Sequence, residues 1–169
     1  MNAPAPSVRP ATADDIEELL DLRVSVLAGG EVTDAWRQTF GQDLRERLGA
    51  DPDLFVFVAP DPEAEGRLLA CAIGMAYRGY RGPEYPAGRW ARVMTVATRP
   101  HARRRGYGRA VMRALVDALR AADCSSIELR ATAEGEALYR TLGFTRIPSG
   151  SYMVLRPSPD APTAAGMRP

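Results

Sequence analysis

Hydrophobic residues recur along this chain at two spacings, one typical of helices and one of strands. Apolar residues three and four positions apart predict four helices, at about 12–28, 33–48, 106–122 and 134–142. Shorter apolar runs predict strands at 8–10, 54–58, 68–77, 90–98 and 126–131, followed by a closing hairpin of 144–147 and 152–155. This order of elements predicts a domain of the α/β (α+β) class with a mixed sheet.

The breaks between these elements indicate one domain with flexible ends. Residues 1–7 and 157–169 are rich in Ala and Pro, so we expect them to flank a single domain at 8–156. Thr12 followed by Asp15 is typical of a helix cap, and Gly29-Gly30 of a helix end. The Gly-, Pro- and Tyr-rich stretch 78–88 is expected to be a loop.

Composition narrows the classes of function. The chain is 46% hydrophobic and 25% charged, and its 22 basic residues, all arginine, almost balance 21 acidic ones. This balance argues against binding to nucleic acid or to acidic membranes. Without lysine, neither a Walker phosphate loop nor Schiff-base chemistry is available. No apolar run is long enough for a membrane helix, and the first residues do not form a signal peptide. Two isolated cysteines and one histidine predict a cytoplasmic protein without a metal site.

The clearest candidate for chemistry is the run Arg103-Arg104-Arg105-Gly106-Tyr107-Gly108, between a predicted strand and the strongest predicted helix. The first N–H groups of a helix have no partner within it, and the helix dipole attracts negative charge to that end. Glycine lets the backbone approach an anion closely, and arginine can bind phosphate oxygens with two hydrogen bonds. The run therefore predicts a site for a phosphorylated cofactor.

Two motifs in this order resemble those of the GNAT family of acetyl-CoA-dependent N-acetyltransferases. Arg103-x-x-Gly106-x-Gly108 is similar to the pyrophosphate-binding motif after the family's fourth strand. Ala137-Leu138-Tyr139-x-x-Leu142-Gly143-Phe144 is similar to its late helix. The resemblance covers most of the chain in element order. It implies a twisted, mostly antiparallel sheet of six to seven strands flanked by about four helices.

The resemblance also implies roles for individual residues. The backbone of Val96, Ala97 and Thr98 would pair with the pantetheine arm of acetyl-CoA. The loop would hold the diphosphate, through residues Arg103, Arg104, Arg105, Gly106, Tyr107, Gly108 and Arg109. Tyr139 would donate a proton to the departing thiolate, which is reasonable because a phenol titrates near ~10 and a thiol near ~8.5. Thr132 stands where many relatives have an asparagine that contacts the coenzyme.

The predicted fourth strand contains no acidic residue, although relatives often carry a glutamate base there. An alkylamine with a pKa near ~10.4 must lose a proton before it attacks, which costs on the order of 4 kcal/mol at pH 7. Glu128 on the following strand is the first candidate for the base, and Glu84 and Asp34 are alternatives. An arylamine or hydrazine acceptor would need no base. The single histidine, His101, lies in the connector before the loop and is not assigned a catalytic role.

The acceptor is expected to be a small molecule that carries an amine. Trp36, Tyr80, Tyr85 and Glu84 are the candidates for contacts with it, because the second helix and the 78–88 loop would flank the cleft. An antibiotic, an amino acid or a protein amine remains an alternative acceptor, as does an acyl group larger than acetyl. We expect a monomer or a homodimer. The alternative function is a module that binds acetyl-CoA as a sensor without catalysis.

Overall fold

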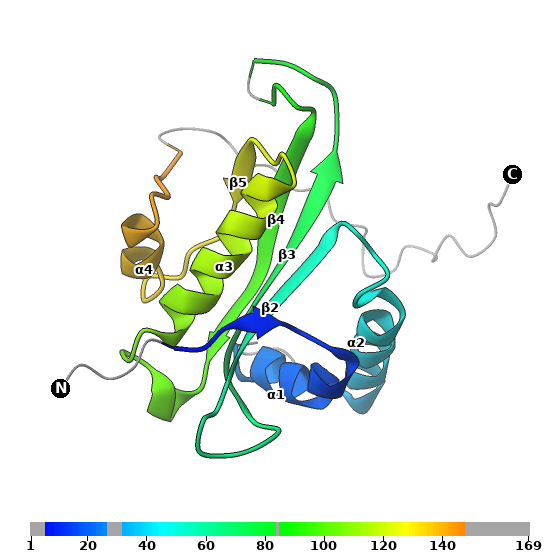
Figure 1. The fold of residues 1–169 in the computed structure, drawn as a ribbon, viewed down its shortest axis with the longest axis vertical. Coiled ribbons are helices and arrows are strands. Elements are labelled where there is room, and N and C mark those ends of the chain that lie inside the picture. The colour runs from blue at the N-terminus through cyan, green and yellow to red at the C-terminus, as the bar shows by residue number, and fades with distance from the viewer. Residues whose placement is uncertain (1–5, 27–31, 84, 148–169) are drawn as a thin grey trace, which may run out of the picture.

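The computed structural model describes residues 6–26, 32–83 and 85–147. In these residues one five-stranded sheet has the strand order β1-β2-β3-β4-β5, with helices on both faces (Figure 1). The elements in chain order are β1 (Arg9–Pro10), η1 (Ala13–Asp15), α1 (Ile16–Val26), α2 (Asp34–Arg47), β2 (Leu54–Pro60), β3 (Leu68–Arg78), β4 (Arg89–Thr98), η2 (Pro100–Ala102), α3 (Tyr107–Ala121), β5 (Ser126–Glu128) and α4 (Glu136–Thr141). Neighbouring strands are antiparallel from β1 to β4, and β5 is parallel to β4.

The predicted mixed α/β fold with a mostly antiparallel sheet and four α-helices is confirmed, with fewer strands than expected. The predicted hairpin is not formed by 144–147, which have no regular structure, and its second half, 152–155, lies outside the described residues. β5 ends at Glu128 instead of continuing to Ala131. The predicted helix end at Gly29-Gly30 and the predicted boundary at 156 lie outside the described residues, and the boundary at 7 stays a prediction.

The sheet separates two hydrophobic clusters. Alternate residues of β3 point to opposite faces, so Ala70, Ala72 and Ala76 pack in the cluster beneath α3, whereas Cys71 and Ile73 pack beneath α1 and α2. α3 contributes a buried stripe that includes Val111, Leu115 and Leu119. The amphipathic pattern of the predicted helix 106–122 is thus explained, because its apolar side packs on one face of the sheet.

The start of α1 is fixed by the predicted pair Thr12 and Asp15. The Asp15 carboxylate accepts a hydrogen bond from the Thr12 backbone N–H at 2.7 Å, and Arg9 binds it with two nitrogens at 2.7 and 2.8 Å. Burial alone would raise the pKa of Asp15, but these hydrogen bonds lower it below its usual value. β1 and α1 are therefore joined through one buried carboxylate.

A β-bulge divides β4 into two halves. Ile73 of β3 pairs with Thr95, but its neighbour Gly74 pairs with Val93, so Met94 is the extra residue. Ala91 and Val93 lie in the cluster beneath α3, whereas Ala97, after the bulge, lies in the cluster beneath α1. The extra residue thus exchanges the two faces of the strand. β5 pairs with β4 only at Trp90, Ala91 and Arg92, all of which come before the bulge.

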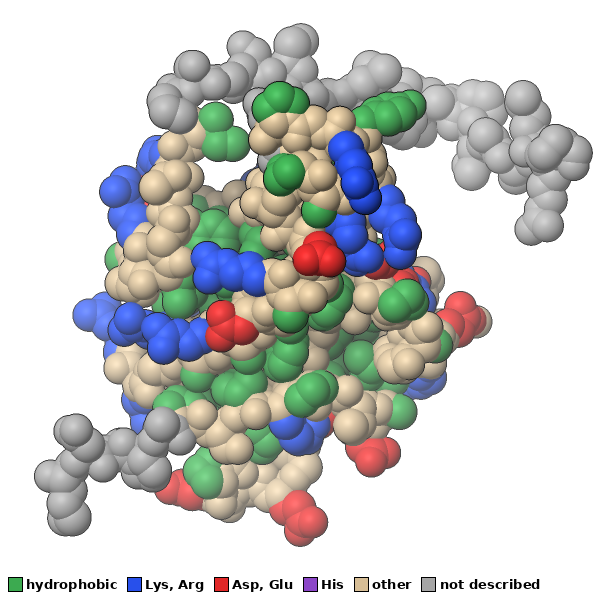
Figure 2. Space-filling model, turned by 45° about the horizontal axis from the view of Figure 1, so that its top comes forward, with side chains coloured by type: hydrophobic (Ala, Val, Ile, Leu, Met, Phe, Trp, Pro, Cys, Tyr) green, Lys and Arg blue, Asp and Glu red, His purple; other side chains and the backbone are tan. Residues whose placement is uncertain are grey.

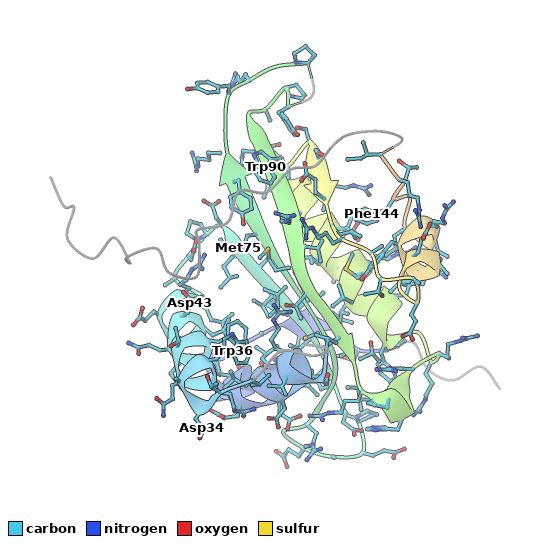
Figure 3. The ribbon with its side chains drawn as sticks, turned by 180° about the vertical axis from the view of Figure 1, so that it is seen from behind. Asp34, Trp36, Asp43, Met75, Trp90 and Phe144 are labelled. Carbon is cyan, nitrogen blue, oxygen red and sulfur yellow. The ribbon has the colours of Figure 1, made fainter. Side chains whose placement is uncertain are left out.

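Figure 3 shows the face of the sheet that carries α1 and α2. These helices cover one end of the face, whereas Met75 and Trp90 lie on the part beyond them. Trp90 stacks on Tyr77, its partner in the antiparallel pairing, with ring centroids 4.4 Å apart. Within the described residues, no helix is both apolar and long enough to cross a lipid bilayer.

Gly74 is predicted to be required for the packing of α3 on the sheet. A Cβ at this position would lie 3.0 and 3.2 Å from the two Cδ atoms of Leu115. We expect Gly74→Ala to lower the free energy of unfolding by about 1–3 kcal/mol, measured by urea denaturation. The matched control is Gly82→Ala, where an added Cβ meets no atom within 4 Å. Equal stability of the two variants would contradict this account of the packing.

Candidate active site

The loop between β4 and α3 has an unusual backbone conformation. After η2, Arg104 has a φ of 62° and Gly106 a φ of 89°, so two residues of the loop lie in the left-handed region. A non-glycine residue rarely adopts this conformation, and such residues concentrate at functional sites. Gly106 is the N-cap of α3, a helix of 15 residues whose first N–H groups therefore border the loop. The loop thus brings left-handed backbone and a helix N-terminus together, and the anion site stays a prediction.

The arginine side chains of the loop are available to a ligand. Arg103, Arg104 and Arg105 are all exposed. The Arg105 guanidinium lies 5.7 Å from the centre of the Tyr107 ring, and Arg103 reaches the Thr98 carbonyl oxygen at 3.4 Å. In the described parts of the chain, no carboxylate forms an ion pair with any of these three arginines. Their positive charge is therefore not neutralised within this part of the protein.

Gly108 marks the point where three elements meet. A Cβ on this residue would lie 3.0 Å from the Thr98 hydroxyl oxygen at the end of β4. It would also lie 3.6 Å from a methyl carbon of Leu138 on α4. The first turn of α3 can therefore approach the end of β4 this closely because position 108 lacks a side chain, whereas the distance to Leu138 is an ordinary van der Waals contact.

The second half of β4 has an open edge. β3 pairs with one side of Val96, Ala97 and Thr98, but β5 reaches only as far as Arg92 on the other side. Among the described residues, no strand pairs with this second side of 96–98. An extended ligand with amide groups could add to such an edge as a strand does.

Tyr139 is held in place by close packing on α4. Its ring meets the edge of the Phe144 ring, with centroids 6.1 Å apart and an angle of 68° between the planes. A Cβ on Gly135 would lie 3.0 Å from Cε2 of Tyr139, so the ring packs directly on the backbone there. Burial raises the pKa of the phenol above its usual value. Among the described residues no hydrogen-bond partner is found for its hydroxyl group.

A cleft of about 1040 Å³ is lined by Tyr139, Glu128 and Tyr85, among other residues. The cleft lies between α3, β5 and α4, and the segment after α4 forms its outer side. Figure 2 shows hydrophobic side chains exposed on this side of the molecule, with arginine side chains beside them. Glu128 shares the cleft with Arg92, its partner in the parallel pairing of β4 with β5.

Other candidates from the sequence lie elsewhere. Trp36 stacks on Phe40 along α2, with ring centroids 5.3 Å apart, and Figure 3 places it far from Phe144. Tyr80 is 97% exposed and does not line the cleft. Asp34, at the start of α2, and His101, in η2, are both exposed outside it. Glu84 is not among the described residues.

Thr132 has a structural partner. Its hydroxyl accepts a hydrogen bond from the Gly135 N–H at 3.1 Å, and its carbonyl accepts one from Glu136. The side chain therefore stabilises the turn that leads into α4, where relatives would carry the asparagine. Its predicted contact with the coenzyme stays a prediction.

Sequence reasoning missed several charged residues of the cleft. Glu136 of α4 binds Arg146 and Arg140, and these hydrogen bonds lower its pKa to about 2. The ion pair with Arg146 holds the segment after α4 against the helix that carries Tyr139. Only the i,i+4 spacing of Glu136 and Arg140 was visible as a signal in the sequence. The described residues contain no group of three or more His, Cys, Asp or Glu side chains that could hold a metal ion.

Comparison with known proteins agrees with this geometry. The model of the acetyltransferase (GNAT) family matches residues 17–144. The chain therefore belongs to the GNAT acetyltransferase family, and the resemblance seen in its motifs is confirmed. Among curated proteins, no sequence matches the chain.

Solved structures with the same fold include three bacterial proteins. A putative acetyltransferase from Agrobacterium tumefaciens is 27% identical, with a TM-score of 0.69 and coverage of 89% of this chain and 99% of that one. A GCN5-related N-acetyltransferase from Ralstonia eutropha is 25% identical, with a TM-score of 0.72 and coverage of 88% and 97%. A predicted acetyltransferase from Clostridium acetobutylicum, solved with acetyl-CoA, is 20% identical, with a TM-score of 0.75 and coverage of 89% and 95%.

Gly106→Ala is expected to weaken the binding of coenzyme A. A side chain in the left-handed region costs about 1–2 kcal/mol, and the loop can relieve this strain only by moving its N–H groups. We expect a rise of about fivefold in Kd, measured by calorimetry, because 1 kcal/mol corresponds to about that factor. Gly66→Ala is the control, since Gly66 has a similar φ of 77° in the turn between β2 and β3. It should lower stability without changing the Kd, and an equal loss of affinity in both variants would refute a specific role for the loop.

Proposed function

We propose that this protein is an N-acetyltransferase that moves an acetyl group from acetyl-CoA to the amine of a small molecule by direct attack in a ternary complex. The observation that carries the proposal is the convergence of three features at the end of β4. These are the open strand edge at 96–98, the left-handed loop at the start of α3, and α4 with the phenol of Tyr139, whose neighbour Leu138 lies beside Gly108 as Thr98 does. The membership of the GNAT family supports acetyl transfer itself.

The residues present fit acetyl-CoA. Two left-handed residues, the first N–H groups of α3 and three arginines that pair with no carboxylate of the described residues suit a diphosphate. Val96, Ala97 and Thr98 offer backbone groups to the amides of a pantetheine arm. The coenzyme supplies a thioester, which is the activated acyl donor. Arg103 to Arg109 would bind and orient its diphosphate end, and the open edge of β4 its thioester end.

Tyr139 is proposed to hold the proton that the sulfur takes up. Burial raises the pKa of its phenol, so the group remains protonated throughout the neutral and mildly alkaline range. The departing thiolate is the conjugate base of a thiol with a pKa near ~8.5, so it is a much stronger base than water. A nearby O–H group therefore stabilises the negative charge that develops on the sulfur. The packing of the ring against Gly135 and Phe144 fixes the direction of the hydroxyl.

Glu128 is proposed to take the proton from the amine, directly or through water. It lies at the end of β5 and lines the cleft that also contains Tyr139. β4 has no carboxylate, and Glu136, the other acid among the described residues of the cleft, is engaged by two arginines. Tyr85 lines the same cleft and is proposed to contact the acceptor there. Trp36 and Tyr80 do not line the cleft, so they could contact only an acceptor that extends beyond it.

Tyr139→Phe is expected to lower kcat by about 10²-fold, because the proton donor is lost. The release of free thiol from acetyl-CoA in the presence of an amine panel measures this change. The Kd for coenzyme A should remain the same, since the hydroxyl acts on the departing sulfur rather than in binding. Tyr80→Phe is the control, because that ring is fully exposed outside the cleft.

Two results of this experiment would overturn parts of the proposal. Undiminished turnover by Tyr139→Phe would exclude the phenol as the acid. Binding of coenzyme A by the unmodified protein without turnover of any amine would favour the alternative function, a sensor that binds acetyl-CoA.

Glu128→Gln is expected to distinguish acceptors by their basicity. With an alkylamine, kcat/KM at pH 7 should fall by about 10²-fold, because most of the amine is protonated and needs a base. With an arylamine, which is already neutral at this pH, the change should be less than about threefold. Glu134→Gln, an exposed residue in the turn before α4 that does not line the cleft, is the control. An equal loss with both kinds of acceptor would exclude Glu128 as the base.

A further inference from the structure

An ion pair at the C-terminal end of β4 connects α1 to the start of the loop between β4 and α3. The Glu18 carboxylate of α1 accepts a hydrogen bond from Nη2 of Arg99 at 2.7 Å. Both side chains are mostly buried, with 16% of Glu18 and 18% of Arg99 exposed. Arg99 follows the last residue of β4 and precedes η2, so it stands where the strand changes into the loop.

Both partners are also bound to the backbone of β3. Nε of Arg99 donates to the Leu68 carbonyl oxygen at 2.8 Å, and the Leu68 N–H donates to the same carboxylate oxygen of Glu18 at 2.9 Å. A planar guanidinium that binds a carboxylate and a carbonyl at once has little freedom to rotate. The pair therefore fixes the ends of two strands relative to α1.

The main chain of Arg99 is fixed as well. Its N–H donates to the Leu69 carbonyl at 2.8 Å, and its carbonyl accepts from the Ala102 N–H at 2.9 Å, which closes the turn of η2. Ala102 is fully buried, and the exposed arginines of the loop follow it directly. Arg99 is thus the last residue before the loop that is held by its side chain, its N–H and its carbonyl together.

We propose that Glu18 and Arg99 are positioning residues that set the place of the diphosphate-binding loop. The inference rests on the proposed function, because it assigns the coenzyme to this loop. Donors that bind an anion must be held within a fraction of an ångström, and the loop has two left-handed residues but few packed side chains of its own. Its position therefore depends on the point from which it starts.

The test is the affinity for coenzyme A, measured by calorimetry, of Glu18→Gln and Arg99→Lys. Glutamine keeps an oxygen for the Leu68 N–H but loses the charge, and lysine keeps the charge but loses the planar pair of donors. We expect the Kd to rise about tenfold in each variant. The KM for acetyl-CoA should rise by the same factor, while kcat at saturation changes by less than about twofold.

The control is Glu17→Gln. Glu17 is the neighbouring residue of α1 and forms an ion pair with Arg45 of α2 at 2.9 Å, where both side chains are largely exposed. This pair leads to α2 and not to β4, so its loss should leave the Kd within about twofold of the unmodified protein. Thermal unfolding of all the variants shows the temperature range in which each is folded, and binding is measured within it. If Glu18→Gln does not fold, Arg99→Lys, which retains the charge, provides the test of the Kd on its own.

The outcomes separate this inference from the proposed function. If the unmodified protein itself binds no coenzyme A, the proposed function fails. If it binds coenzyme A and the two variants bind equally well, the pair is structural only and the inference is overturned. A lower kcat with unchanged KM would overturn it too, because the defect would then lie at the thioester end of the site and not at the loop.

Discussion

One extra residue in β4 determines how this strand pairs on its two sides and which face it presents to each layer of helices. Met94 shifts the pairing with β3 by one position, so the strand before it and the strand after it present opposite faces to the two layers of helices. β5 pairs with β4 only before the bulge. On the side opposite to β3, the backbone of 96–98 is therefore an edge that no described strand covers, and α4, which carries Tyr139, comes close to its end where Leu138 and Thr98 both lie beside Gly108.

Two glycines and one buried ion pair allow other elements to pack closely around β4. Gly74 allows Leu115 to pack on the sheet, and Gly108 allows the start of α3 to contact Thr98 and Leu138. On the opposite face, Glu18 and Arg99 connect α1 to the point where β4 ends. The loop between β4 and α3 is thus supported from both layers, although its own residues are exposed. Under the proposed function such support matters, because a diphosphate site depends on the direction of several N–H groups at once.

The helices, most of the strands and the loop could be predicted from the sequence because each has a local signal. The stripe of α3 and the spacing of Gly106 and Gly108 depend only on neighbouring residues. The bulge could not be predicted, since Met94 is an apolar residue in an apolar strand and the shift arises from the pairing with β3. The pair of Glu18 and Arg99 could not be predicted either, because 81 residues separate them. Trp36 was expected at the cleft from its place on α2, but α2 packs on the opposite face of the sheet from α3, and the cleft is lined from α3, β5 and α4.

The cleft and the loop are surrounded by guanidinium groups, and lysine is absent from the sequence. A guanidinium stays protonated at any pH at which a protein is folded, so it cannot act as a nucleophile toward a thioester. Apart from its α-amino group, the protein therefore presents no amine of its own to an activated acyl donor. Acylation of its own amines, a common side reaction of proteins that are exposed to reactive thioesters, has almost no target on this surface.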